Sequence, residues 1–212
     1  MDLPRPVPPP VMRIRLPLSR SSLNIVCSSP CIMLVFSYTS RDGLESQFGK
    51  GPTMKLDIKN ATKADLPGLL RLNKQIQQQH AEQFPKEFLF EPDAKGTRDF
   101  FKRLIDEDSQ LLLIAHTADQ SVGYLWCEIQ RFPKSLFRPA RSKLYVQHVC
   151  VDADHRRHGI ASALFQQVDD LAKAAGITRI GLDTWAGNES AHSFFQSRGF
   201  ETQQIIYGKN LD

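Results

Sequence analysis

The sequence of 212 residues lacks an apolar run long enough to cross a membrane. The longest run near the start covers only residues 31–36, whereas a bilayer-spanning helix needs about 20 apolar residues. We therefore expect no transmembrane helix and no membrane partner.

Cysteine is also scarce, with four residues in the chain. Cys27 and Cys31 have no second pair of metal ligands beside them, while Cys127 and Cys150 lie in apolar runs, where cysteine behaves as a small buried hydrophobe. These positions predict neither a disulfide framework nor a metal site. They favour a reducing compartment, and we expect a cytoplasmic protein.

Charge of one sign is nearly absent from most of the chain. The formal net charge is +4, and residues 1–53 supply 6 of the 27 Lys and Arg against 3 of the 23 Asp and Glu. Residues 54–212 thus hold 21 basic and 20 acidic side chains. Binding to nucleic acid needs clustered basic residues that displace counterions from phosphates, so we expect no nucleic-acid partner.

Residues 1–53 also hold 8 of the 13 prolines. Their composition, rich in Pro, Ser and Arg, suits an organellar transit peptide, but the prolines oppose the amphipathic helix that such a peptide forms. We expect this segment to be a disordered leader or a non-native extension before a start at Met54, with a targeting segment as the alternative. The folded domain is expected over residues 54–212.

The pattern of this second part predicts a mixed α/β fold. Thr62, Asp65 and Pro67 are typical of a helix start, and Gly176 of a helix end. Predicted strands cover residues 55–59, 111–116, 122–129, 144–151, 177–184 and 202–209, and predicted helices cover 62–83, 97–106, 160–175 and 190–197. A Pro- and Arg-rich connection is expected over residues 132–141. This order predicts antiparallel strands at the front of a sheet and a parallel crossover at its centre.

One segment carries a chemical signal, at residues 149–161. A buried strand ends there, a short basic loop with Arg156 and Arg157 turns, and a helix begins at Gly159. The unpaired N–H groups and positive dipole end of such a helix start bind anions, and small side chains let an anion approach closely. The segment lacks the glycines of a dinucleotide fingerprint and the Lys-Ser/Thr of a Walker loop. It therefore predicts a site for a phosphate or diphosphate.

This segment resembles a known family. Arg156-x-x-Gly159-x-Ala161 is similar to the Q/R-x-x-G-x-G/A signature of the GNAT superfamily of acyl-CoA-dependent N-acetyltransferases. A second block, Asn188-x-x-Ala191-x-x-Phe194-Phe195-x-x-x-Gly199-Phe200, resembles that family's next conserved stretch. The resemblance covers residues 55–212. It implies a mostly antiparallel sheet with a central splayed pair of parallel strands and flanking helices.

The resemblance also implies how acetyl-CoA binds as co-substrate, with no metal. The pantetheine arm would pair with the backbone of Val149, Cys150 and Val151. The diphosphate would lie on the N–H groups of Arg156, Arg157, His158, Gly159, Ile160 and Ala161. Asn188 and Phe195 would line the coenzyme on its far side. The reaction implied is direct attack of an amine on the thioester, with a backbone N–H stabilising the oxyanion.

Two positions depart from the family pattern. Many relatives place a Glu base where this chain has Gln147, which cannot accept the proton, so the base is either a water relay or another group. The neighbouring His148 is one candidate; the alternative is a hydrogen-bonded histidine beneath a helix. Because side chains alternate along a strand, we expect Tyr145 and Gln147 on one face and His148 on the other.

The second departure is Phe195, where many relatives have a tyrosine that protonates the leaving thiolate. Tyr207 on the predicted last strand is the candidate substitute; the alternative is a packed Tyr with its hydroxyl at the surface. A dedicated acid is not strictly required, because the coenzyme thiolate is a tolerable leaving group near neutral pH.

The acceptor amine is expected to meet residues between the first two helices and near the strand ends. The candidates are His80, Phe84, Phe88, Phe90, Glu128, Tyr145 and Asp183, the two carboxylates selecting a cationic amine. Trp126 and Trp185 are expected to be structural. The resemblance implies an N-acetyltransferase for a small molecule or peptide. The alternatives are a protein lysine or N-terminal acetyltransferase, or a regulatory module that binds acetyl-CoA with little turnover. Homodimer formation stays open.

Removal of residues 1–53 tests the proposed division. We expect a protein that begins at Met54 to keep the melting temperature and the coenzyme affinity of the whole chain, because every motif lies after that residue. Thermal melts and titration with acetyl-CoA on the two proteins measure this. A truncated protein that no longer folds or binds would refute the division.

Overall fold

The computed structural model of the chain describes residues 55–211. Its elements are β1 (Asp57–Asn60), a 3-10 turn (Lys63–Asp65), α1 (Leu66–Gln83), α2 (Ala94–Asp106), β2 (Gln110–His116), β3 (Ser121–Phe132), β4 (Arg141–Val151), a second 3-10 turn (Ala153–His155), α3 (Ile160–Ala174), β5 (Ile180–Gly181) and α4 (Glu189–Ser197). The predictions for residues 1–53, including those for Cys27 and Cys31, lie outside the described residues.

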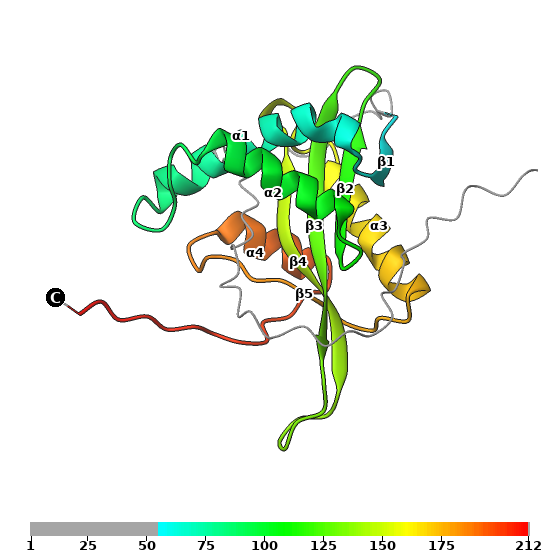
Figure 1. The fold of residues 1–212 in the computed structure, drawn as a ribbon. Coiled ribbons are helices and arrows are strands. Elements are labelled where there is room, and N and C mark those ends of the chain that lie inside the picture. The colour runs from blue at the N-terminus through cyan, green and yellow to red at the C-terminus, as the bar shows by residue number, and fades with distance from the viewer. Residues whose placement is uncertain (1–54, 212) are drawn as a thin grey trace, which may run out of the picture.

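The strands form one sheet in the order β1-β2-β3-β4-β5. Neighbours from β1 to β4 are antiparallel, and β4 and β5 are parallel, joined by the crossover through α3. Figure 1 shows α1 and α2 lying across one face of the sheet, with α3 behind it. The predicted mixed sheet with a central parallel pair is therefore confirmed. Within residues 55–211, no helix is long and apolar enough to cross a membrane.

Each face of the sheet has its own apolar core. Leu69, Leu72 and Phe101 from α1 and α2 pack on Ile114 and Tyr124 of the sheet. On the opposite face, side chains of α3 and α4 pack on the alternate residues of the same strands: Ile160, Leu164, Phe165, Val168, Phe195, Leu113, Leu125, Val146 and Val149. This alternation is expected for a sheet with both faces covered.

The helix ends lie close to where local chemistry predicts them. The Asp65 carboxylate accepts hydrogen bonds from the Thr62 backbone N–H and hydroxyl, both at 2.8 Å, and Pro67 lies in the first turn of α1. Gly176, with φ +67°, follows the end of α3, as its left-handed conformation predicts. The predicted helices are confirmed, with α2 beginning three residues early at Ala94.

A β-bulge at Gln147 changes which side chains of β4 share a face. Val146 lies opposite Cys127 and His148 opposite Trp126, so Gln147 has no counterpart on β3. The extra residue shifts the alternation, and His148 lies on the face covered by α1 and α2, the same face as Tyr145. The predicted separation of His148 from Tyr145 is therefore wrong.

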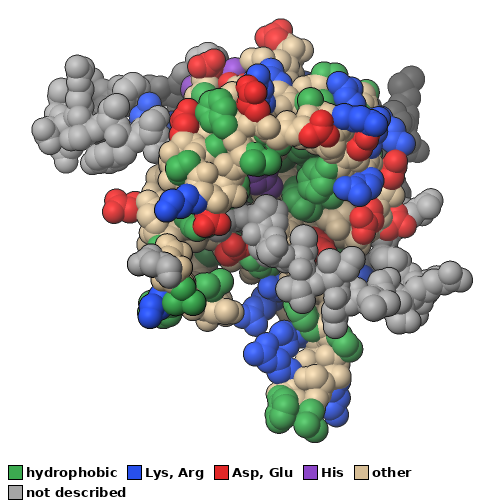
Figure 2. Space-filling view, turned by 60° about the vertical axis from the view of Figure 1, so that its left-hand side comes forward, with side chains coloured by type: hydrophobic (Ala, Val, Ile, Leu, Met, Phe, Trp, Pro, Cys, Tyr) green, Lys and Arg blue, Asp and Glu red, His purple; other side chains and the backbone are tan. Residues whose placement is uncertain are grey.

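The connection predicted over residues 132–141 is shorter than expected, because β3 and β4 continue to pair as far as Phe132 and Arg141. Beyond Glu128 they leave the sheet as a two-stranded arm, residues 129–143 (Figure 1). The arm contains five Lys and Arg and no acidic residue. Figure 2 shows basic side chains along this protrusion and apolar ones at its tip, where Leu136 and Phe137 are almost fully exposed.

The end of the chain differs from the prediction. The predicted strand over residues 177–184 is reduced to Ile180 and Gly181, and the strand predicted over 202–209 is absent. Residues 201–211 instead run away from the body as irregular chain (Figure 1), with Ile206 and Tyr207 exposed. A further strand needs a neighbouring edge, and β5 offers only two residues for pairing.

Asp152 ties α1 to the loop that follows β4. Its buried carboxylate accepts hydrogen bonds from the Arg71 guanidinium and, at 3.1 Å, from the Asp154 N–H. Burial alone raises the pKa of Asp152, but these hydrogen bonds outweigh it and hold the pKa below its ordinary value. The ionised carboxylate therefore stabilises the fold at neutral pH.

We expect Asp152→Asn to lower the free energy of unfolding at pH 7 by about 1–3 kcal/mol, because Arg71 loses its charged partner. A depressed pKa stabilises the fold above the unfolded value of about 4, and this contribution disappears as pH falls through the folded pKa. The difference between variant and wild type should therefore shrink in acid. Denaturant unfolding at pH 7 and 3 measures it, with exposed Asp154→Asn as the control; equal stabilities at pH 7 would contradict the assignment.

Candidate active site

β4 and β5 separate almost as soon as they pair, and one edge of β4 stays open. The two strands pair only at Leu144 with Ile180 and at Tyr145 with Gly181. Residues 146–151 therefore have β3 on one side and no strand on the other. Backbone N–H and C=O groups on such an edge need another partner. The expected splay is confirmed, and the predicted coenzyme segment of residues 149–151 lies along it.

The side chains of this segment pack into the two cores. Val149 and Val151 belong to the core beneath α3, while the Cys150 thiol donates to the Leu72 carbonyl at 3.3 Å on the other face. Burial raises the pKa of Cys150 to about 12, so it stays a neutral thiol near pH 7. The open edge therefore presents backbone groups to a ligand.

The loop after β4 forms the start of α3. Arg157 and Gly159 have φ values of +63° and +78°, and α3 begins at Ile160. The first intrahelical bond is donated by the Ala163 N–H to the Gly159 carbonyl, so the N–H groups of the preceding helical residues point outward. A Cβ at Gly159 would meet nothing within 4 Å. The helix start is thus open to a bound anion.

The side chains of the loop contribute unequally. The Arg156 guanidinium donates to the Gln79 side-chain oxygen at 3.1 Å and to the Val151 carbonyl at 3.5 Å, and so faces α1 and β4. Arg157 and His158 are exposed. Of the predicted diphosphate residues, Arg157 and His158 have side chains turned to solvent beside the helix start.

The segment after β5 carries polar atoms without partners. The Asn188 side-chain oxygen Oδ1 accepts a hydrogen bond from the Ala191 N–H at 3.1 Å and so caps α4. The side-chain nitrogen Nδ2 is buried and forms no hydrogen bond with a described residue. The same holds for the Thr184 hydroxyl and the Trp185 indole N–H. Buried polar groups without a partner are rare in folded proteins, so these atoms indicate a ligand surface beside the gap that opens between β4 and the segment after β5.

Phe195, predicted beside the coenzyme, lies in the core beneath α3 and is 4% exposed. Its ring contacts those of Phe165, Phe194 and Phe200 with centroids 5.6–5.8 Å apart. Phe195 therefore holds α4 against α3. As a phenylalanine, it has no hydroxyl that could protonate a leaving thiolate.

An aromatic cluster joins the end of α1 to the segment that follows β5. The ring of Phe84, at the end of α1, stacks on Trp185 at 4.4 Å, and Phe88 lies between Trp185 and His80. His80 in turn lies 5.7 Å from His148 of β4. The structure thus places the predicted acceptor residues His80, Phe84 and Phe88 in one cluster with Trp185. Trp185 was expected to be structural, and no local sequence pattern marks it as a site residue.

Both histidines of this cluster are buried and uncharged. Burial lowers the pKa of His80 to about 4, and burial followed by the nearby His80 lowers that of His148 to about 3. The Tyr124 hydroxyl, which accepts from the Asn73 amide at 3.2 Å, shares a hydrogen bond with His148 Nδ1. The cluster is therefore a neutral wall at physiological pH.

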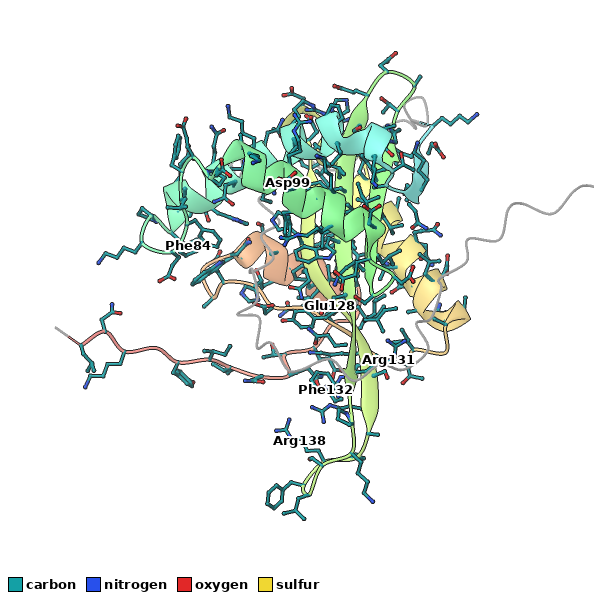
Figure 3. The ribbon with its side chains drawn as sticks, viewed as in Figure 1. Phe84, Asp99, Glu128, Arg131, Phe132 and Arg138 are labelled. Atoms are coloured by element: carbon teal, nitrogen blue, oxygen red, sulfur yellow. The ribbon has the colours of Figure 1, made fainter. Side chains whose placement is uncertain are left out.

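Gln147 lies where this wall meets the root of the arm. Its amide nitrogen donates to Glu128 Oε2 at 2.8 Å, and the Gln130 amide donates to the same oxygen at 3.2 Å. Gln147 is 3% exposed, and its own oxygen is buried without a partner among the described residues. Figure 3 shows Glu128 at the root of the arm and Phe84 at the end of α1. The Tyr145 hydroxyl donates to the Asp183 carboxylate close by.

Two candidates lie apart from these residues. Tyr207 is 89% exposed on the irregular C-terminal segment, and Phe90 is 53% exposed. Within residues 55–211, no three His, Cys, Asp or Glu side chains gather as metal ligands.

Comparison with known proteins agrees with this arrangement. The N-acetyltransferase MJ1207 of Methanocaldococcus jannaschii, named as uncharacterized, is 27% identical over 156 residues, which cover 71% of this chain and 63% of that protein. The match thus spans less than two thirds of that relative. An aminoglycoside N(6')-acetyltransferase type 1 of Acinetobacter baumannii is 30% identical over 110 residues, 51% of this chain and 75% of that one.

Solved structures share the fold. A tetramutant of the BH1408 protein of Bacillus halodurans aligns with a TM-score of 0.68 and 23% identity, covering 73% of this chain and 99% of that chain. Aminoglycoside 6'-N-acetyltransferase AAC(6')-Ih of Acinetobacter baumannii aligns with a TM-score of 0.58 and 23% identity, covering 74% and 99%. Residues 73–200, more than half of the chain, match the model of the Acetyltransferase (GNAT) family, and the chain therefore belongs to that family.

Proposed function

We propose that this protein transfers the acetyl group of acetyl-CoA to a primary amine of a small molecule or peptide. The observation that carries the proposal is the open edge of β4, which ends at the anion-binding start of α3. A coenzyme with an amide-rich arm and a diphosphate matches both parts at once. The unpartnered Asn188 amide and Trp185 N–H offer it further donors across the gap.

The two described cysteines support direct transfer to the amine. Burial raises the pKa of Cys127 well above its ordinary value and that of Cys150 to about 12, so neither supplies a thiolate to carry the acetyl group. In direct transfer, the amine nitrogen forms a bond to the carbonyl carbon, the carbon–sulfur bond breaks and the thiolate leaves. A backbone N–H of the open β4 edge would stabilise the oxyanion. Neither of the two described cysteines forms a disulfide, which is usual in the reducing cytoplasm and agrees with the location we propose.

The acceptor site combines a neutral aromatic wall with carboxylates. Phe84, Phe88 and Trp185 offer ring faces, and Glu128 and Asp183 lie beside Tyr145. A cationic amine with an apolar or sugar-like body fits such a surface, because ring faces and carboxylates both attract cations. The names of the aminoglycoside acetyltransferase relatives agree with such an acceptor. The name of N-alpha-acetyltransferase 30 of Schizosaccharomyces pombe, which is 26% identical, supports a peptide acceptor as the alternative.

An amine panel tests the proposal. We expect acetyl-CoA to bind in calorimetry and at least one of spermidine, neamine and a lysine-containing peptide to cause release of the coenzyme thiol. Cationic amines should exceed a neutral amide control. Binding without release for any amine would favour the regulatory alternative, and absence of binding would refute the proposed function.

Substitution of Gly159 tests the diphosphate site. Gly159→Leu should weaken coenzyme binding at least tenfold, because a side chain would enter the open space at the helix start. Gly176→Leu is the matched control. It has a similar left-handed φ of +67° and equally open surroundings at the other end of α3, so it has the same backbone cost of about 1–2 kcal/mol. Titration of both variants with coenzyme A measures the difference; equal affinities would contradict the assignment.

A further inference from the structure

The proposed reaction needs a proton acceptor, and the bulge at Gln147 indicates where it lies. An alkylamine with a pKa of about 10 is protonated at neutral pH and must lose a proton to attack. Glutamine has no basic group, yet the Gln147 amide is buried beside the open edge of β4 and donates to Glu128. The side chain therefore links the reaction site to a carboxylate on the neighbouring strand.

The hydrogen bonds orient the Glu128 carboxylate. Its Oε2 accepts from both Gln147 and Gln130, and no described residue donates to its Oε1. Glu128 is only partly buried, opposite Tyr145 in the sheet, so Oε1 remains accessible to a ligand. Two amide donors on one oxygen fix the direction of the carboxylate relative to β4.

The orientation of the Gln147 amide adds a second acceptor. Because its nitrogen faces Glu128, its oxygen is directed elsewhere, and that oxygen is buried without a partner among residues 55–211. An ammonium group has three donors and no acceptor. Two acceptors, one from Gln147 and one from Glu128, match such a group.

Other titratable groups nearby are less suited to receive the proton. His80 and His148 have pKa values near 4 and 3, and His148 Nδ1 is bonded to Tyr124. Asp183 already accepts from the Tyr145 hydroxyl. The Lys143 ammonium lies 4.1 Å above the Tyr145 ring and interacts electrostatically with Glu128 and Asp183.

On the basis of the proposed function, we infer that Glu128 is the general base of acetyl transfer and that Gln147 is a positioning residue which holds it. Glu128 Oε1 accepts the proton that the acceptor nitrogen loses. The nitrogen electron pair forms the bond to the carbonyl carbon, and the carbon–sulfur electron pair leaves with the thiolate. Glu128 then passes this proton to solvent, and the second proton of the bonded nitrogen is lost to the thiolate or to solvent as the amide forms. A carboxylate on β3, the strand next to β4, thereby performs the step that the Gln147 side chain cannot perform.

The test compares Glu128→Gln with wild type, using the amine of the panel that gives the fastest thiol release. We expect kcat to fall by about 10²–10⁴ at pH 7, as for loss of a general base, with unchanged affinity for coenzyme A. The deficit should shrink towards pH 10, because the acceptor then loses its proton without help. A merely structural role would lower the rate equally at every pH.

Two further variants separate the roles. In the exchange variant, Glu128→Gln with Gln147→Glu, the carboxylate and amide change places across a 2.8 Å contact, and we expect it to recover much of the lost kcat. Gln147→Leu should lower kcat less than Glu128→Gln and keep the wild-type pH profile. Exposed Glu201→Gln is the control. Full activity of Glu128→Gln at pH 7, or a deficit that does not vary with pH, would overturn the inference, whereas a wild type inactive on all amines would refute the proposed function itself.

Discussion

The organisation of the site depends on the separation of β4 from β5 after Tyr145. A strand edge that loses its neighbour exposes backbone donors and acceptors, which in a folded protein must find water or a ligand. Here the open edge leads directly into a helix start whose N–H groups are also unpartnered. One irregularity in the sheet thus produces a continuous line of backbone groups, and the side chains of residues 149–151 remain available for the two cores.

The bulge at Gln147 determines which side chains meet at that edge. Without the extra residue, the side chains of β4 would alternate regularly, and Tyr145 and His148 would lie on opposite faces. With it, both lie on the face covered by α1 and α2, beside Glu128. The period-2 rule therefore fails at Gln147, where the bulge lies. A bulge has no reliable sequence signature, because it depends on pairing with a neighbouring strand.

Features set by nearby residues were predictable, and those set by distant contacts were not. Thr62 with Asp65, Gly159 and Gly176 predict the ends of α1 and α3 because their hydrogen bonds and dihedral angles are local. The strand predicted over residues 202–209 has a suitable apolar pattern but no edge to pair with, and the arm extends through a segment whose prolines and arginines favour a loop. The position of Trp185 against Phe84 joins segments a hundred residues apart, which no local pattern specifies.

The neutral wall beside Glu128 has an electrostatic consequence for any cation that binds there. His80 and His148 stay uncharged because burial disfavours their protonated forms, and the aromatic rings add no net charge. A cation that enters this region therefore meets attraction from carboxylates and no opposing charge from the histidines, in surroundings where solvent screens less than at the surface. Protonation of the wall would repel the same cation. Burial of the two histidines thus keeps this wall uncharged across the physiological pH range, while the open edge of β4 and the start of α3 present unpaired backbone groups.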